Sequence, residues 1–362
     1  MSIQVSYKKQ FLIYVLLLLV LLAAVEVILR AYDYFEPNCR FIETDVYDKI
    51  SFDLKREICI DNDKLVWNNN PLYLIPNQHF KTINVNSDGF RGDELQNNPD
   101  YRIFVIGGST MFGVGSTSDY TTISGYLQKK ISVKLPEHNI EIINAGTPKA
   151  YSFTESNLIK NKLLEYNPDL LIIYDGWNDL SHDYEHYFDS GDYKLMDQII
   201  RLIRQGDYVT PTVILKWYFN AQHDNIDVMP FNPSSIEQKV SLWSDAWVDI
   251  CNLQNEHDFK TVIMIQPIVG TGNKLLSPEE QQHFLHYDHE SKIHYYQLYA
   301  DALPKLNSVC TATYDLRNVF DSFSETIFYD PGHVGDFGND IIAEKIYEKI
   351  IPIIIRDISD EK

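Results

Sequence analysis

The stretch YRIFVIGGS at residues 101–109 is the most informative part of the sequence. Apart from Arg102, residues 101–106 are apolar, and two glycines and Ser109 follow at once. A short apolar run without polar alternation is typical of a strand that is buried on both faces, as in a parallel sheet. In open parallel sheets, ligands bind just beyond the carboxyl ends of the strands. The stretch therefore predicts a buried strand that presents Ser109 at a ligand-binding edge.

Four more apolar runs of this kind follow along the chain, each ending in polar or turn-forming residues. They are Ile140–Ile143, Leu170–Tyr174, Thr261–Ile265 and Val309–Tyr314. Helical patterns lie between them, at residues 121–134, 151–166 and 236–250, after Ser277, and at 342–350, where Pro352 should end or kink the last helix. Capping boxes are predicted at Ser234 with Glu237 and at Ser277 with Glu280. Strands that alternate with helices predict a three-layer α/β/α sandwich, flavodoxin-like, around a five-stranded parallel sheet.

The N-terminal region predicts a membrane anchor. Lys8 and Lys9 precede a run from Phe11 to Leu29 that is apolar except for Glu26, and its 19 positions approach the length of a spanning helix. A cleaved signal peptide is the alternative, but cleavage after Ala24 would place Leu22 where a small residue is preferred. We therefore expect a cytoplasmic tail at 1–10, a single transmembrane helix at 11–30, and the rest of the chain outside the cell membrane.

Composition limits the possible functions. The chain has 362 residues, 44% of them hydrophobic, and a formal net charge of −20, which excludes a mostly disordered chain and disfavours nucleic-acid binding. Residues 31–100 are expected to form an irregular lead-in segment, with many turn formers at 86–93. Residues 101–355 are expected to form the main domain, and residues 181–231 to form an insertion that acts as a lid or shapes the substrate site.

Residues with complementary chemistry follow several of the predicted strands. Ser109 follows the first strand, Gly146 the second and Asn178 the third, while Asp330 and His333 lie in the loop after the fifth. A serine hydroxyl becomes a nucleophile when a base such as histidine takes its proton, and a carboxylate orients that base. The Ser109 and Gly146 amides and the Asn178 side chain can donate to an oxyanion. The pattern predicts a Ser109–His333–Asp330 triad with these three oxyanion donors.

These motifs resemble those of the SGNH hydrolases, the GDSL-type esterases and lipases. Gly107-Gly108-Ser109 resembles the nucleophile block, although the aspartate usual before the serine is Gly108 here. The other blocks are NAG at 144–146, GWND at 176–179 and DPGH at 330–333. The anchor, the sequence SDGFRG at 87–92 and the Gln266-Pro267 pair also look like membrane-anchored prokaryotic members. The resemblance, which covers roughly residues 101–355, implies the SGNH fold and the same catalytic residues.

The function expected from the triad and the resemblance is ester hydrolysis through an acyl-enzyme, with a small-molecule, lipid or glycan ester as substrate and no cofactor. Acyl transfer to an envelope glycan or lipid is one alternative, and a non-catalytic surface binding module is another. A metal site is disfavoured, because no cysteine or carboxylate pattern completes the histidines at 182, 186, 283, 286 and 289. A phosphate loop is disfavoured, because no Gly-Lys-Ser/Thr follows the glycines at 107–115.

Four cysteines are present, at positions 39, 59, 251 and 310, and their spacing matches no zinc motif. Disulfides are permitted outside the membrane. A bond between Cys39 and Cys59 would stabilise a segment with little core of its own, and is predicted here; four unpaired thiols are the alternative.

Overall fold

The computed structural model describes residues 6–35, 39–69, 71–181, 210–211, 214, 235–285 and 289–360. The chain divides into two compact units. One comprises Met1–Cys39 with Glu185–Met229, and the other comprises Arg40–Tyr184 with Pro230–Lys362. Most of the predicted insertion, including its Trp217, lies outside the described residues.

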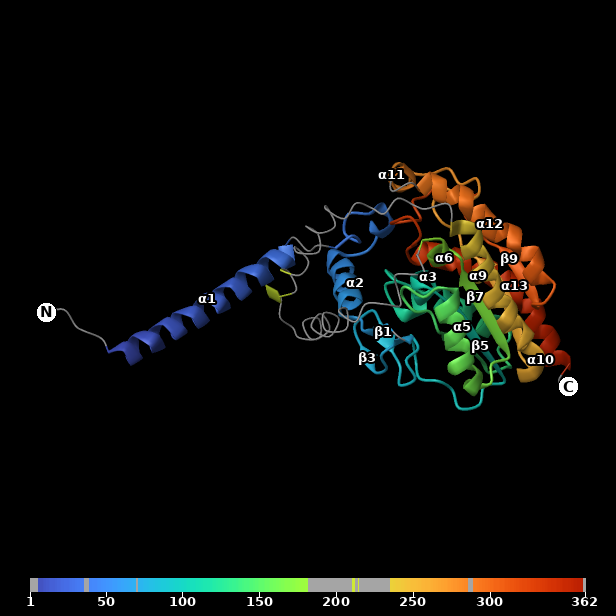
Figure 1. Cartoon of the computed structure of the whole chain (residues 1–362), viewed down its shortest axis with the longest axis horizontal. Coiled ribbons are helices and arrows are strands. Elements are labelled where there is room, and N and C mark those ends of the chain that lie inside the picture. The colour runs from blue at the N-terminus through green and yellow to red at the C-terminus, as the bar shows by residue number, and fades with distance from the viewer. Residues whose placement is uncertain are drawn as a thin grey trace. The chain divides into compact units, whose positions relative to one another are not determined.

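The larger unit is built on a five-stranded sheet in the order β6-β5-β7-β8-β9, in which every neighbouring pair is parallel. Figure 1 labels β5, β7 and β9 of this sheet. The strands are β5 (Tyr101–Gly107), β6 (Ile140–Asn144), β7 (Leu170–Asp175), β8 (Lys260–Ile265) and β9 (Ala312–Asp315). The predicted five-stranded parallel sheet is confirmed, and only β9 begins later than expected. Because β5 lies inside the sheet with β6 on one side and β7 on the other, its carboxyl end is flanked by theirs.

Helices cover both faces of the sheet. On β5, Ile103 and Val105 belong to one apolar core and Phe104 and Ile106 to the other, as the alternation of a strand requires. The first core includes residues of α4 (Ile123–Lys134) and α13 (Asp336–Asp360), and the second includes residues of α5 (Ser152–Asn161), α9 (Ile236–Asn252) and α12 (His289–Asn307). The three-layer sandwich implied by the resemblance to the SGNH hydrolases is therefore confirmed at the level of the fold.

Most predicted helix boundaries lie within a few residues of the observed ones, but the pattern at 151–166 is divided between α5 and η3 (Leu163–Tyr166), and the pattern at 342–350 is part of the longer α13. Pro352 lies inside α13, which continues to Asp360, because Ile353 and Ile354 on the following turn are buried in the core. At the start of α11 (Pro278–Leu285), Ser277 and Glu280 exchange the two capping bonds that were predicted. Ser234 lies outside the described residues, and α9 is preceded instead by Ser235.

Shorter elements are η1 (Asp45–Tyr47), α3 (Ser109–Phe112), η2 (Asp119–Thr121), η3 (Leu163–Tyr166), α6 (Trp177–Ser181) and α10 (Gln254–His257).

The segment before the sheet is more regular than the sequence suggested. It contains α2 (Phe52–Lys64) and two antiparallel hairpins, β1 (Trp67–Asn69) with β2 (Leu72–Leu74) and β3 (Gln78–His79) with β4 (Asn84–Val85). The expectation of irregular structure was wrong for α2, whose first turn is capped by the Ser51 hydroxyl and which buries Ile58. Residues 40–100 pack into the same compact unit as the sheet.

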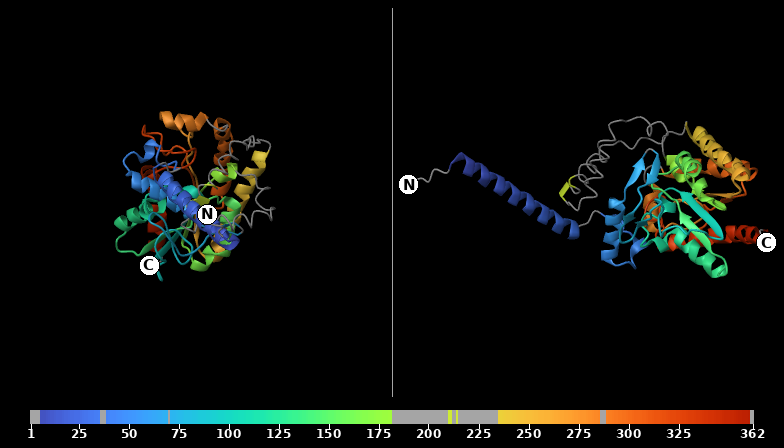
Figure 2. Two further views of the ribbon diagram at one scale, coloured as in Figure 1. Left: turned by 90° about the vertical axis from the view of Figure 1, so that its left-hand side faces the viewer. Right: turned by 90° about the horizontal axis from the view of Figure 1, so that it is seen from below.

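The smaller unit contains α1 (Tyr7–Phe35), one continuous helix (Figure 2). Within Tyr7–Tyr32, an 18-residue window has a mean hydropathy of 3.1, so the helix is long and apolar enough to cross a membrane. Glu26 in this helix pairs with Arg30 at 2.8 Å and accepts a hydrogen bond from the Thr210 amide at 2.9 Å. The single charged residue that interrupts the apolar run is therefore compensated within its own unit.

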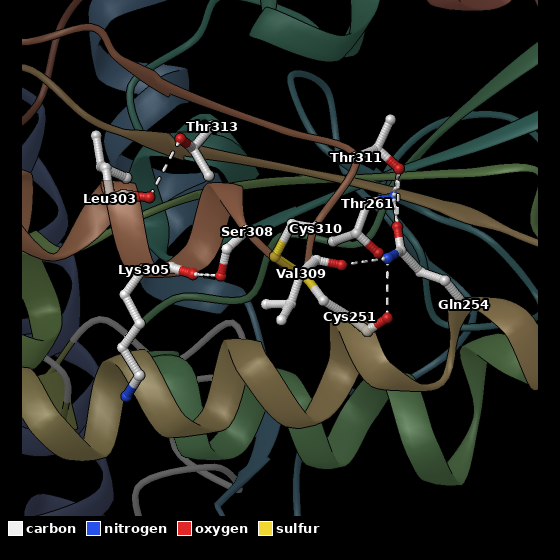
Figure 3. The surroundings of a disulfide bond; sticks show 10 residues. All are labelled: Cys251, Gln254, Thr261, Leu303, Lys305, Ser308, Val309, Cys310, Thr311 and Thr313. Atoms are coloured by element: carbon white, nitrogen blue, oxygen red, sulfur yellow. Dashed lines mark hydrogen bonds between the residues drawn. A yellow bond between two sulfur atoms is a disulfide. The ribbon is translucent and has the colours of Figure 1, made fainter.

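All four cysteines are disulfide-bonded. Cys251 at the end of α9 is bonded to Cys310, which lies just before β9 (Figure 3). The Gln254 side chain donates to the carbonyls of Cys251 and Val309 beside this bond. The sequence analysis did not predict this pairing; the bonded state of Cys39 and Cys59 agrees with the disulfide that it did predict.

Three carboxyl groups are buried together beneath the carboxyl end of β7. Glu155, Asp175 and Asp179 are each at most 1% exposed. Trp243 Nε1 donates to Asp175 at 3.0 Å and the Ser152 amide donates to Asp179, but neither Glu155 oxygen has a hydrogen-bond partner among the described residues. Burial, and then the charges of Asp175 and Asp179, raise the pKa of the Glu155 carboxyl well above its usual value.

We predict that Glu155→Gln stabilises the protein increasingly as the pH rises. An unfolded glutamate loses its proton above about pH 4, whereas the folded protein retains it, so stability falls with rising pH until the folded-state pKa is reached. Glutamine removes this cost. The gain in the free energy of unfolding should be near zero at about pH 4 and about 1–3 kcal/mol at about pH 8.

Thermal unfolding of the full-length protein in detergent measures this difference, with Glu137→Gln at an exposed position as the matched control. A Glu155→Gln variant that is less stable than the wild type at the higher pH would contradict a protonated Glu155.

Candidate active site

Ser109 lies at a sharp turn from strand to helix. The strand β5 ends at Gly107 and α3 begins at Ser109, with Gly108 as the N-cap residue. A side chain at Gly107 would place its Cβ 2.4 Å from the Tyr174 carbonyl oxygen, and one at Gly108 would place its Cβ 2.3 Å from Asn178 Nδ2. Glycine is required at position 107 because a side chain there would meet a backbone carbonyl, whereas a side chain at position 108 would meet the Asn178 amide, which would have to move.

The structure brings the three predicted triad residues together. His333 Nε2 lies 2.6 Å from Ser109 Oγ, and His333 Nδ1 lies 2.9 Å from both carboxylate oxygens of Asp330. Because a carboxylate only accepts hydrogen bonds, Nδ1 carries the proton and Nε2 accepts from the serine hydroxyl. This is the arrangement in which an imidazole can take the proton of a serine nucleophile.

Asp330 is held by more than the histidine ring. Its Oδ1 accepts from the amides of Gly332 at 3.0 Å and His333 at 2.8 Å, so the turn that carries the histidine closes on the carboxylate. Its Oδ2 accepts from Nη1 of Arg40 at 2.9 Å. Burial by itself raises the pKa of the Asp330 carboxyl, but His333 and Arg40 together hold it well below its usual range. The carboxyl is therefore ionised at neutral pH.

An aromatic cluster supports the histidine from the side. The rings of Tyr329 and His333 stack at 12° with their centroids 5.7 Å apart, and Phe41 packs edge-on against Tyr329. The Tyr329 hydroxyl donates to the Val114 carbonyl at 2.7 Å, and that of Tyr47 donates to the Gly115 carbonyl at 2.6 Å. The cluster thus connects the Asp330–His333 loop to the turn that follows α3.

Asn178 lies beside the nucleophile turn, on α6. Its Nδ2 donates to the Ala150 carbonyl at 2.6 Å and is the atom that a Cβ at Gly108 would meet. The neighbouring Trp177 packs against Gly332 in the loop that carries the histidine. The Asn178 amide is therefore next to the backbone of the serine turn, as an oxyanion donor must be.

Gly146 lies behind α3, in the loop after β6. Its N–H donates to the Asn144 side chain at 3.0 Å, and a Cβ at this position would lie 2.3 Å from the Phe112 amide nitrogen. Asn144 Nδ2 in turn donates to the carbonyls of Met111 and Phe112. The absence of a side chain at Gly146 lets this loop pack on α3, and its role as an oxyanion donor stays a prediction.

Arg40 and Tyr329 were missed by the sequence analysis. Tyr329 directly precedes Asp330 of the DPGH motif, and this adjacency was the one feature of the sequence that could have indicated its role beside the histidine. Arg40 lies 290 positions before Asp330 in the chain, so no local pattern indicates their contact.

The described residues contain no group of three His, Cys, Asp or Glu side chains that could hold a metal ion. His283 lies 3.8 Å from Glu279, and the ring of His289 is not described. His182, His186 and His286 lie outside the described part of the chain. Of the five histidines considered as metal ligands, the side chain of His283 alone is described.

No family model matches the sequence, and no curated protein matches it. Among solved structures, the acetyl xylan esterase AlAXEase is 15% identical, with a TM-score of 0.43 over 69% of this chain and 100% of its own. A catalytic mutant of Axe2, an acetylxylan esterase from Geobacillus stearothermophilus, is 11% identical, with a TM-score of 0.44 over 71% of this chain and 97% of its own. A GDSL-like lipase from Parabacteroides merdae is 12% identical, with a TM-score of 0.43 over 70% of this chain and 96% of its own. At these identities the similarity does not identify an activity for this chain.

We predict that Gly108→Ala weakens the reactivity of Ser109 by displacing Asn178. The added Cβ would overlap Asn178 Nδ2, so the amide must move away from the serine turn. The rate of Ser109 labelling by a fluorophosphonate should fall by about 10²-fold, the size of an oxyanion-donor loss.

A double-mutant cycle provides the control. If Gly108→Ala acts through Asn178, it should lower the labelling rate little further in an Asn178→Ala background, where the overlap is removed. Full additivity of the two losses would contradict this mechanism.

Proposed function

We propose that this protein is a serine ester hydrolase that uses Ser109, His333 and Asp330 as a catalytic triad. The observation that carries the proposal is the continuous hydrogen-bond chain from Ser109 Oγ through both nitrogens of His333 to Asp330. Such a chain serves to activate a serine hydroxyl.

In the first half-reaction, Ser109 Oγ attacks the acyl carbon while His333 Nε2 takes the hydroxyl proton. The negative charge that develops on the carbonyl oxygen is stabilised by the Ser109 amide and the Asn178 side chain. The Gly146 amide, the third expected donor, donates to Asn144 Oδ1 in this structure and would have to leave that bond to take part. The intermediate then collapses, the ester C–O bond breaks, and His333 returns the proton to the leaving alcohol. Asp330 stabilises the transient imidazolium.

In the second half-reaction, His333 takes a proton from a water molecule, whose oxygen attacks the acyl-enzyme. The bond between the acyl carbon and Ser109 Oγ then breaks, His333 Nε2 returns its proton to Oγ, and the carboxylic acid is released. The chemistry uses only residues of this chain and requires no metal or organic cofactor. The substrate is a small-molecule, lipid or glycan ester.

We also propose that the enzyme is anchored in the cell membrane by α1 with its catalytic unit outside the cell. The support is the apolar stretch Tyr7–Tyr32 and the two lysines, Lys8 and Lys9, at its start, which favour a cytoplasmic N-terminus. The disulfide between Cys251 and Cys310 fits an oxidising compartment.

Activity-based labelling tests the nucleophile. A fluorophosphonate should modify Ser109 in the wild type and not in Ser109→Ala, with the modified peptide identified by mass spectrometry. A wild type that is folded but not labelled would contradict the hydrolase assignment and favour a binding module.

The kinetic cost of each substitution should follow its role. Ser109→Ala and His333→Ala should each lower kcat for an aryl acetate by about 10⁴-fold or more, because triad members act as a unit. Asp330→Ala should retain roughly ten-fold more activity, because it removes the orienting group only. Asn178→Ala should lower kcat by about 10²–10³-fold with little change in KM. Near-wild-type turnover by a folded Ser109→Ala variant would exclude Ser109 as the nucleophile.

The fate of the acyl group separates hydrolysis from acyl transfer. The wild type should release free acid from an aryl ester at the same rate in the presence and absence of a soluble sugar or glycan acceptor. Acylated acceptor formed at the expense of free acid would identify an acyltransferase.

A further inference from the structure

We propose that Arg40 is a positioning residue for the triad, acting through Asp330 to set the orientation and the proton affinity of His333. This inference rests on the proposed function and assigns it a residue outside the four motif blocks. The first observation is the contact itself, in which Arg40 Nη1 donates to Asp330 Oδ2 at 2.9 Å.

The hydrogen bonds of Asp330 explain why this contact matters. Oδ1 already accepts from two backbone amides of its own loop, at Gly332 and His333, whereas Oδ2 accepts from Arg40. His333 Nδ1 is equally close to both oxygens, at 2.9 Å. Without Arg40, the bond from the histidine ring would be the one contact to Oδ2 among the described residues, and rotation of the carboxylate would no longer be opposed from that side.

The guanidinium is itself held in place. Its central carbon lies 5.3 Å from the ring centroids of both Phe41 and Tyr329, within the range of cation–π attraction. Tyr329 also stacks on His333. Arg40 therefore contacts the Asp330–His333 loop twice, through the Asp330 carboxylate and through the Tyr329 ring. The Arg40 side chain is half-exposed, at 52%, yet it has two directional partners on the loop.

The positive charge of Arg40 should affect the protonation of the His333 imidazole. A positive charge beside the Asp330–His333 pair opposes protonation of the ring, so its removal should favour the imidazolium. Among the described residues, Ser109 of α3 and Tyr329 of the same loop face the pair, and Arg40 and Tyr47 reach it from the segment at 40–47. Asp63 acts on Arg40, and Asp336 acts on Tyr47. Arg40 is the cation of this set, and no other group in it replaces that charge.

The test compares Arg40→Met with Arg40→Lys in the full-length protein, with Arg356→Met as the matched control. Arg356 is exposed on α13, about 30 Å along the helix from its first residue at 336. The first readout is the NMR titration of His333 with ¹³C-labelled histidine, assigned by His333→Gln, because it does not depend on turnover. The second is the pH profile of ester hydrolysis.

The midpoint of the His333 titration should rise by about 0.5–1 pH unit in Arg40→Met, stay near the wild-type value in Arg40→Lys, and be unchanged in Arg356→Met. The acid limb of kcat/KM should move with it. In addition, kcat should fall by about ten-fold in Arg40→Met at constant KM, because the imidazole is less well aligned. A merely structural role would lower thermal stability without moving the titration.

Two outcomes would overturn the proposal. One is a His333 midpoint in Arg40→Met that equals the wild-type value, and the other is a rise in KM at constant kcat, which would assign Arg40 to substrate binding. If the wild type neither labels nor hydrolyses esters, the proposed function fails, but the titration still decides whether Arg40 acts on His333.

Discussion

The structure of the site depends on one carboxylate. Asp330 accepts hydrogen bonds from the imidazole, from two amides of its own turn and from Arg40, and these donors serve three different purposes. The amides fix the turn, the imidazole is the group to be oriented, and the guanidinium balances the charge. A largely buried carboxylate without such donors would become protonated and could no longer stabilise an imidazolium. The same contacts that keep Asp330 ionised therefore also define where His333 can lie.

The serine is fixed by a different constraint, the close approach of backbones around α3. Gly107 and Gly108 leave room for the Tyr174 carbonyl and the Asn178 amide, while Gly146 lets the next loop reach the Phe112 amide. The far end of α3 is held by Arg91, whose guanidinium donates to the carbonyls of Phe112 and Gly113 and pairs with Asp119. A four-residue helix has few hydrogen bonds of its own, so these outside contacts determine the position of Ser109.

The elements that could be predicted from the sequence are those whose signal is local. The apolar runs of β5 to β8 are each bounded by glycine or polar residues, and the motif residues follow strand ends directly, so topology alone brings Ser109 and Asn178 to one edge. Two contacts join distant parts of the chain: the disulfide between Cys251 and Cys310 and the hydrogen bond between Arg40 and Asp330. No local sequence pattern predicts either of them. The helix α2 was missed because its buried positions are few, and its Ser51 cap resembles any turn serine.

These long-range contacts change how the segment at 40–100 is understood. Arg40, Phe41 and Tyr47 contact the loop of the histidine or the turn after α3, and Arg91 holds the end of the serine helix. Both halves of the proposed triad are therefore supported by residues that precede the first strand of the sheet. A fragment cut at Tyr101 would keep every residue of the four motif blocks and yet lose the guanidinium on Asp330 and the one on α3. Motif content is thus a poor guide to the smallest fragment that would keep the proposed site intact, which on physical grounds begins no later than Arg40.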